Sequence, residues 1–320
     1  NIMKKLLYLF LTVLIVGCSG EDGNSNDVNE PSDCNVVYLA DNGVTIKACS
    51  SASIGDTGVI NGVTYTVVDE DMLREMVANE EDVTKVVTTK VTNMFELFFI
   101  ATETTTDFNQ DISSWDVSNV TDMGFMFANA TAFNQPIGNW DVSNVTSMKQ
   151  MFYNAASFNQ PIGDWDVSNV TNMQTMFYRV VAFNQPIGNW DVSNVTTMQT
   201  MFHSAHIFNQ PIGNWNVSNV TDMSGMFFYS DAFNQPIGNW DVSNVTDMLG
   251  MFFYSNTFNQ PIGNWDVSNV VIMYVMFSDA ISFNQDLSSW SVNGVTDCYN
   301  FSDGATSWTL PQPNFTNCTP

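Results

Sequence analysis

The chain has 320 residues, of which 33 are acidic and 8 are lysine or arginine, and its formal net charge is −25. Such a charge excludes nucleic acid and anionic lipid surfaces from the expected partners, because their phosphates would be repelled. Apolar residues make up 44% of the chain, so its acidity does not indicate a disordered polymer.

The first residues are typical of an export signal. Lys4 and Lys5 precede an apolar run over residues 6–16 that is too short to span a bilayer. The stretch 14–18, Leu-Ile-Val-Gly-Cys, resembles a bacterial lipobox, in which cleavage leaves an acylated N-terminal cysteine. This resemblance implies a signal peptide over 1–17 and a lipid anchor on Cys18. The alternative is a signal peptide followed by a chance cysteine.

Residues 18–33 are polar, acidic and free of aromatic residues, which is typical of a flexible tether. Ser19 after the anchor resembles an outer-membrane sorting signal, and Glu21-Asp22 resembles the surface-export signals of some Gram-negative lipoproteins. The resemblance implies a lipid-anchored protein at the outer membrane, on the cell surface of a Gram-negative bacterium. The lipid would be its one contact with the membrane.

Four further cysteines favour disulfides, since an even number in an exported chain is typical of bridges. Sequence alone allows three connectivities of these residues. We expect Cys34–Cys49 and Cys298–Cys318, because each pair lies within one terminal region. None of the spacings matches a Cys-x-x-Cys metal knuckle.

Residues 34–80 are predicted to form an N-terminal cap. Apolar runs on both sides of Asp41-Asn42-Gly43 and of Asn61-Gly62 indicate two β-hairpins. The stretch 69–79 begins with acids and ends with Asn79, which predicts a short helix. Such a segment would cover the open end of the repeats that follow.

A 25-residue unit then recurs eight times without insertion, with Phe at every 25th position from Phe108 to Phe283. Strict repetition of this length predicts a solenoid in which each unit packs on its neighbours. A degenerate unit over 83–107 precedes the eight clear ones. We therefore expect an array over 81–307 and a C-terminal cap over 308–320.

The spacing inside one unit predicts the fold of a coil. Ile137, Trp140, Val142 and Val145 have the spacing of a leucine-rich repeat around a short strand. From Val145 to Ala155 the apolar spacing lengthens to three and four, which predicts a short helix. The expected fold is an α/β solenoid with one parallel strand and one helix per coil. The two methionine columns and the Phe and Trp columns are assigned to its core.

An aspartate column is predicted on the outer face of the strand, because Trp140 and Val142 point inward on either side of Asp141. We expect this column to be the ligand face, with solvation of the carboxylates offsetting their mutual repulsion. Calcium on the same carboxylates is the alternative, and no other metal or cofactor is expected. The column comprises Asp116, Asp141, Asp166, Asp191, Asp241 and Asp266.

His203 and His206 are the two histidines, and the repeat frame supplies no evident third and fourth metal ligand beside them. The Asn columns at 119–269 and 134–284 are interpreted as turn residues stacked in amide ladders. No P-loop, nucleophile elbow or zinc-protease helix occurs. Because eight copies of one surface do not converge on one reacting atom, we expect no enzyme activity.

The unit Phe-Asn-Gln-Pro-Ile, Trp-Asp-Val-Ser-Asn-Val-Thr, then Met-Phe, resembles the BspA-like leucine-rich-repeat surface proteins of bacteria. The resemblance covers about 83–307 and implies a non-enzymatic surface protein of a family with some members linked to adhesion. We expect a monomer that binds an extracellular protein or glycan. The alternatives are a structural spacer or coat without a ligand, and an accessory protein that holds polysaccharide for separate enzymes. An ice-binding array is a fourth.

Overall fold

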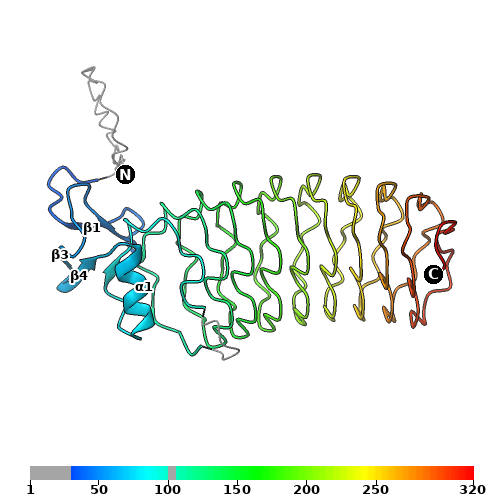
Figure 1. Ribbon diagram of the computed structural model, residues 1–320, viewed down its shortest axis with the longest axis horizontal. Helices are drawn as coiled ribbons and strands as arrows, with labels where there is room; N and C mark the ends of the chain where they lie inside the picture. The colour runs from blue at the N-terminus through cyan, green and yellow to red at the C-terminus, as the bar shows by residue number, and fades with distance from the viewer. Residues whose placement is uncertain (1–29, 100–105) are drawn as a thin grey trace, which may run out of the picture.

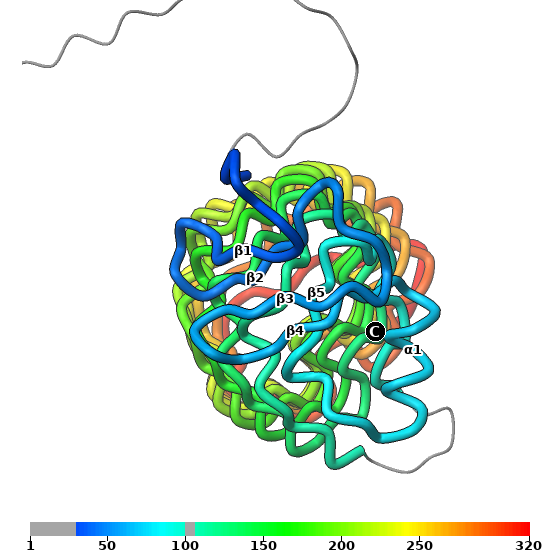
Figure 2. The backbone as a smooth tube through the Cα atoms, turned by 90° about the vertical axis from the view of Figure 1, so that its left-hand side faces the viewer, coloured from blue at the N-terminus to red at the C-terminus, as the bar shows by residue number. Residues whose placement is uncertain are grey.

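The computed structural model describes residues 30–99 and 106–320 as one elongated stack of coils (Figure 1). A small cap of strands and one helix lies at the N-terminal end, and the coils follow in chain order to the C-terminus. Seen along the stack, successive coils lie nearly on top of one another behind the cap strands (Figure 2). The expected signal peptide 1–17, Cys18 and residues 18–29 of the tether lie outside the described residues.

The two predicted hairpins are confirmed. Strand β1 (Val37–Leu39) pairs antiparallel with β2 (Ile46–Ala48), and β3 (Thr57–Ile60) pairs antiparallel with β4 (Val63–Val67). The turn between β3 and β4 is the predicted Asn-Gly pair, and both residues have left-handed φ angles of 50° and 81°. These angles suit a type I′ turn, whose twist matches that of the strands it joins.

The predicted helix is also confirmed, as α1 (Glu70–Ala78). Asp69 caps its N-terminus, because its side chain accepts a hydrogen bond from the Met72 N–H at 2.9 Å. Leu73 is fully buried, and Met72 and Met76 pack beside it on the core of the repeats. The helix therefore buries its apolar face on the array.

The cap is continuous with the first, degenerate coil. Strand β5 (Val86–Val87) belongs to that coil and pairs in parallel with β4 of the cap. The residues predicted to be inward in this coil are buried: Val83, Val86, Thr88, Val91, Met94, Leu97 and Phe98. The hairpins thus extend the array and cover its end.

The predicted strand and helix of each coil are wrong for the eight clear units. Within the described residues these coils contain turns and one isolated parallel bridge each, which joins Ser147 to Asp122 of the coil before and Asn172 of the coil after. Gln150 and Asn154 have left-handed φ angles of 56° and 55°, and a right-handed helix cannot pass through them.

This backbone gives alternate N–H groups different partners. The N–H groups of Met148 and Phe152 donate to carbonyls of the next coil at 3.0 and 3.1 Å, whereas Met151 N–H donates to Met148 O at 3.1 Å within its own coil. The three- and four-residue apolar spacing is therefore produced by turns that face the core. Coils are joined through these backbone bonds in place of a continuous sheet.

The methionine and aromatic columns occupy the core, as predicted. Met148, Met151 and Phe152 are fully buried, and the rings of Phe152 and Phe158 stack at 4.0 Å. The indole N–H of Trp165 donates to the carbonyl of Ile137 in the coil before, at 3.1 Å. Burying an indole in this way satisfies its one donor.

The Asn columns satisfy backbone groups of adjacent coils, as predicted, but not as ladders of one Asn amide on the next. Asn134 Oδ1 accepts from Asn159 N–H and from Gln160 Nε2, each at 3.0 Å. On the other side of the unit, Asn144 Nδ2 donates to Ser118 O at 2.7 Å. A close backbone approach accompanies them, since a Cβ on Gly188 would lie 2.2 Å from Pro211 O. The constant residues of the unit therefore hold one coil to the next.

Both predicted disulfides are present, Cys34–Cys49 in the cap and Cys298–Cys318 at the far end. Trp308 continues the Phe column, with its ring 4.8 Å from that of Phe283. In the described part of the chain, no helix has the length and apolar content needed to cross a membrane.

Candidate functional site

The predicted aspartate column lies on the surface of the stack, but its carboxylates have a local role. Asp141 Oδ1 accepts from the backbone N–H of Ser143 at 3.1 Å and from its hydroxyl at 2.6 Å. The hydrogen bonds from the side chain and backbone of the serine two residues ahead lower the pKa of Asp166, Asp191 and Asp266. Such a bond closes a turn, so the column has a structural use in every coil that carries it. The backbone N–H bond recurs at Asp166, Asp191, Asp241 and Asp266.

Asp116, the first member of the column, is not on the exposed face. It is 2% exposed, and its Oδ1 accepts from the Ser118 hydroxyl at 2.7 Å. Its Oδ2 has no hydrogen-bond partner among the described residues. Including Asp116 in the ligand face is therefore wrong, because its side chain is buried.

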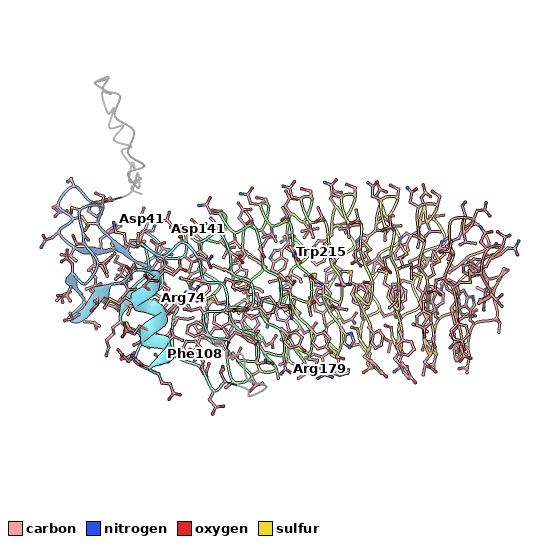
Figure 3. All side chains as sticks on the ribbon, viewed as in Figure 1. Asp41, Arg74, Phe108, Asp141, Arg179 and Trp215 are labelled. Carbon is pink, nitrogen blue, oxygen red and sulfur yellow. A yellow bond between two sulfur atoms is a disulfide. The ribbon has the colours of Figure 1, made fainter. Side chains whose placement is uncertain are left out.

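A second surface differs from coil to coil. Residues 133–145 recur almost unchanged in each unit, whereas the outward residues of the following segment vary. We call this surface the variable face. It consists of the outward residues of 146–157, 171–182, 196–207, 221–232, 246–257 and 271–282. In Figure 3, Arg179 of this face and Asp141 of the aspartate column lie at opposite edges of the stack.

Five aromatic rings form a column on the variable face. Tyr153, Tyr178, His203, Phe228 and Phe253 occupy the same position in consecutive coils, and all are half-buried. Neighbouring ring centroids lie between 4.4 and 4.7 Å apart. The first two rings, and those of His203 and Phe228, are parallel within 7°. The Tyr178–His203 and Phe228–Phe253 pairs are tilted by 34° and 52°, so the column is closely spaced but not uniformly stacked.

Exposed apolar side chains gather on the same face. Between residues 146 and 282 every large apolar side chain that is exposed belongs to it, with Ile207 47% and Ile281 46% exposed. The constant segments in this interval expose none. Exposed apolar area that is concentrated on one side is typical of an interaction surface. The residues are Val181, Ile207, Tyr229, Leu249, Val271 and Ile281.

The lysine and the arginine of the eight clear units also lie on this face. Lys149 and Arg179 are the one lysine and the one arginine after Lys90. Arg179 lies over the Tyr178 ring with its guanidinium carbon 5.4 Å from the centroid, and Lys149 Nζ is 5.9 Å from the Phe125 centroid. Such contacts hold the cations beside the aromatic rings.

The two histidines are part of the face, and sequence analysis missed this. The pKa of His203 is lowered to about 4. Burial of the ring is the largest cause, and the positive charges of Arg179 and His206 act in the same direction. His206 Nδ1 lies 2.8 Å from a carboxylate oxygen of Asp231 in the next coil. The signal was available in the sequence, since Tyr178 and Phe228 are each 25 residues from His203.

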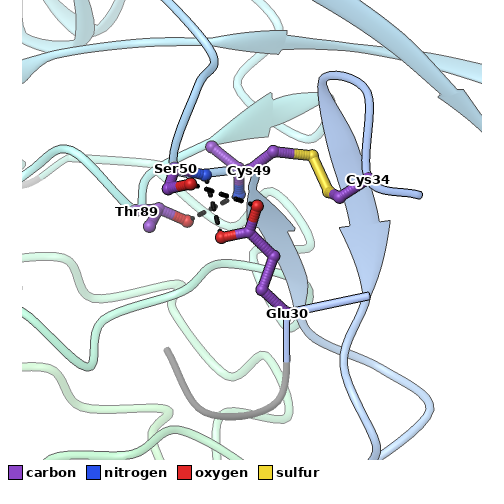
Figure 4. Close-up of a disulfide and its surroundings, with 6 residues drawn as sticks. Glu30, Cys34, Cys49, Ser50 and Thr89 are labelled. Atoms are coloured by element: carbon purple, nitrogen blue, oxygen red, sulfur yellow. Dashed lines mark hydrogen bonds between the residues drawn. A yellow bond between two sulfur atoms is a disulfide. The ribbon is translucent and has the colours of Figure 1, made fainter. Parts of the chain in front are cut away.

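Two other groups of residues are weaker candidates for a functional site. Glu30 gathers with Cys34 and Cys49, but both sulfurs are in the disulfide, so no thiolate is free to bind a metal (Figure 4). The Glu30 carboxylate instead accepts from Ser50 N–H at 3.0 Å. A groove of about 510 Å³ lies where the hairpins meet the first coil. Its lining has one carboxylate, that of Asp111, which accepts from the Ser113 N–H.

Comparison with family models assigns the array. A model described as a Mycoplasma protein of unknown function, DUF285, matches residues 70–184, 160–252 and 231–317. The chain belongs to the DUF285 family. The three DUF285 matches overlap and together run from α1 to the C-terminal disulfide region, so the degenerate coil is part of the family region. Searches of curated proteins and of solved structures found no match.

Proposed function

We propose that this protein is a non-enzymatic, lipid-anchored surface protein that uses its repeats to adhere to a protein partner. The array would be a solenoid related to the leucine-rich repeats of BspA-like proteins, with turns where those have helices or strands. The observation that carries the proposal is the half-buried ring column on the one face that varies between coils. A face that varies while the rest of the unit stays constant is free to follow a ligand.

The ring geometry favours a protein over a glycan. Sugars bind aromatic side chains by lying on an open ring face. Here neighbouring centroids lie 4.4–4.7 Å apart, and the Tyr153–Tyr178 and His203–Phe228 pairs are parallel within 7°, so those ring faces cover each other. Ring edges beside exposed aliphatic groups, an arginine and tyrosine hydroxyls are typical of protein–protein contacts.

The proposed location rests on two features. Cys18 follows a lipobox-like stretch, and the two disulfides favour an oxidising compartment outside the cytoplasm. Labelling of the protein in intact cells with a membrane-impermeant reagent, compared with a Cys18→Ser variant, tests the anchor and the surface location.

Two sets of variants test the binding face. In the first, Tyr178→Ala and Phe228→Ser introduce residue types that occur at the equivalent position of other coils, Ala128 and Ser278. In the second, Asp141→Asn and Asp166→Asn alter the aspartate column, where Asn216 occurs naturally. Each is applied to protein and glycan arrays beside the unchanged protein, with circular dichroism as a check on folding.

Protein binding that falls at least tenfold in the ring variant, and stays within about twofold in the aspartate variant, supports the proposal. The opposite pattern assigns binding to the aspartate column. Binding to glycans alone favours the accessory polysaccharide role. The absence of binding on both the protein and the glycan array favours a structural spacer or coat.

A further inference from the structure

We propose that the variable face binds a second copy of this chain, in an antiparallel dimer that brings the two variable faces together. This inference uses the face on which the proposed function rests. It concerns the protein alone and is measured without a foreign ligand. The observation behind it is the distribution of charge along the face.

The face is divided into a basic half and an acidic half. Its segments 146–157, 171–182 and 196–207 hold Lys149, Arg179 and both histidines, and no acidic residue. Its segments 221–232, 246–257 and 271–282 hold four aspartates, and no lysine, arginine or histidine. The aspartates are Asp222, Asp231, Asp247 and Asp279.

The boundary between the halves falls in the middle of the ring column. His206 and Asp231 face each other across it at 2.8 Å, one from each half. Burial raises the pKa of Asp247, and the neighbouring Asp222 carboxylate raises it further, because the segments of the acidic half place carboxylates side by side. A cation from outside would relieve this repulsion.

A twofold axis across the stack at this boundary makes the face complementary to itself. The axis reverses the order of the coils, so each basic coil of one chain meets an acidic coil of the other. The coil of Arg179 meets that of Asp247, and the coil of Lys149 meets that of Asp279. Lys149 and Arg179 then lie in coils opposite those of Asp279 and Asp247, and exposed apolar groups of the two chains meet along the same strip. Just outside the face, the coils of Asp122 and Asp297 meet as like charges and limit the interface to these six coils.

The size of the face is consistent with a weak dimer. Six coils at ~4.8 Å by a strip roughly 20 Å wide cover on the order of 600 Å² of each chain. Stable complexes bury about 800 Å² per partner, and smaller interfaces are transient. We therefore expect a micromolar dimer whose formation depends on salt.

A foreign partner explains the charges less completely. A lysine-rich segment would suit the acidic half and be repelled by Arg179 and Lys149 in the other half. A second copy uses both halves and needs no further assumption about composition.

Sedimentation velocity of the full-length chain tests the proposal, with Cys18→Ser in every sample so that no acyl chain drives association. One variant, Lys149→Glu with Arg179→Glu, makes the face wholly acidic except for the histidines. A second, Asp247→Lys with Asp279→Lys, neutralises its acidic half and places a lysine opposite each former partner cation. These positions tolerate such changes, because Ile272 is equivalent to Asp247 and Arg179 is equivalent to Asp279.

The unchanged chain should dimerise with rising concentration, and less so when salt is raised from about 50 to about 500 mM. Each variant alone should dimerise at least tenfold more weakly, and an equimolar mixture of the two should recover a heterodimer. The matched control, Asp141→Asn with Asp166→Asn, should dimerise like the unchanged chain.

A chain that stays monomeric up to about 200 µM overturns the proposal. So does a dimer that neither charge variant weakens, or two variants that fail to associate with each other while both remain folded. If the chain stays monomeric but binds a protein on the protein array, the dimer is refuted and the proposed function is supported. If the chain dimerises but binds nothing on the protein and glycan arrays, the dimer is supported and the proposed function is not.

Discussion

One residue type has three different surroundings in this chain. The Asp141 carboxylate is exposed and closes a turn, Asp116 is buried beside the degenerate coil, whose Thr88 hydroxyl donates to its carbonyl, and Asp247 is half-buried beside another carboxylate. The neighbours of each carboxylate therefore decide its role: a serine two residues ahead, the degenerate coil before it, or a carboxylate of the adjacent coil. The 25-residue repeat places all aspartates of one column at the same position of the unit. It does not show which side chains surround each of them.

At the residue scale, His203 should make stability depend on pH. Its pKa of about 4 lies below the ordinary 6.5, so the unfolded chain binds a proton that the folded chain excludes between these values. Stability from this group is thus complete above pH 6.5 and falls as the pH drops toward 4. We expect a loss on the order of 1 kcal/mol at pH 5, reduced because the side chain is half exposed.

The measurement is the difference in urea stability between the unchanged chain and His203→Phe, at pH 7 and pH 5. Phe228 occupies the same position in the next coil, so the ring column should accept the variant. Carboxylates titrate in both proteins and cancel in the difference. An identical pH dependence of the two proteins would contradict the prediction.

At the scale of the element, local signals were sufficient in the cap and insufficient in the coils. The Asn61-Gly62 turn and the Asp69 cap are local, and the hairpin and helix they predict are present. In the coils, the spacing of Met148, Met151 and Phe152 matches a helix, but the N–H groups of alternate residues bond to the next coil. Sequence spacing within one unit cannot reveal a bond whose acceptor lies 24 residues ahead.

The two terminal disulfides should act locally, because each coil touches only its neighbours. Cys298→Ala with Cys318→Ala opens a loop closed by a bridge of sequence separation 20, which contributes about 3 kcal/mol. We expect faster amide hydrogen exchange over residues 298–315 and little change over 34–60. Cys34→Ala with Cys49→Ala is the matched control and should reverse the pattern. Faster exchange throughout the array in either variant would rule out local action.

For the whole molecule, stacking determines both length and surface. The constant residues of each unit bond to the adjacent coil, and the outward residues of 146–157 and its equivalents form a face that runs along the stack. A linear array of this kind gains or loses a unit without changing the contacts elsewhere. The face is therefore a property of several coils together.

Removal of one complete unit, residues 183–207, should leave a folded protein, because Phe208 then takes the place of Phe183 in the register. The maximum dimension from small-angle X-ray scattering should fall by about 5 Å, the spacing of one coil. Deletion of residues 183–195 alone is the control. It should unfold much of the array, because it breaks the 25-residue register and places inward side chains of the next coils outward. Loss of structure in the first deletion would show that the coils are not interchangeable.

The sequence by itself determined the repeat period, the buried columns and the cap hairpins and helix, and it favoured the two disulfide pairs that the structure contains. Each follows from apolar spacing, turn chemistry or position along the chain, which are local or strictly periodic. The tertiary structure decided the backbone of the coil, the burial of Asp116 and the variable face. These depend on what the adjacent coil or the cap supplies: acceptors for alternate N–H groups, cover for a carboxylate, and rings stacked 25 residues apart.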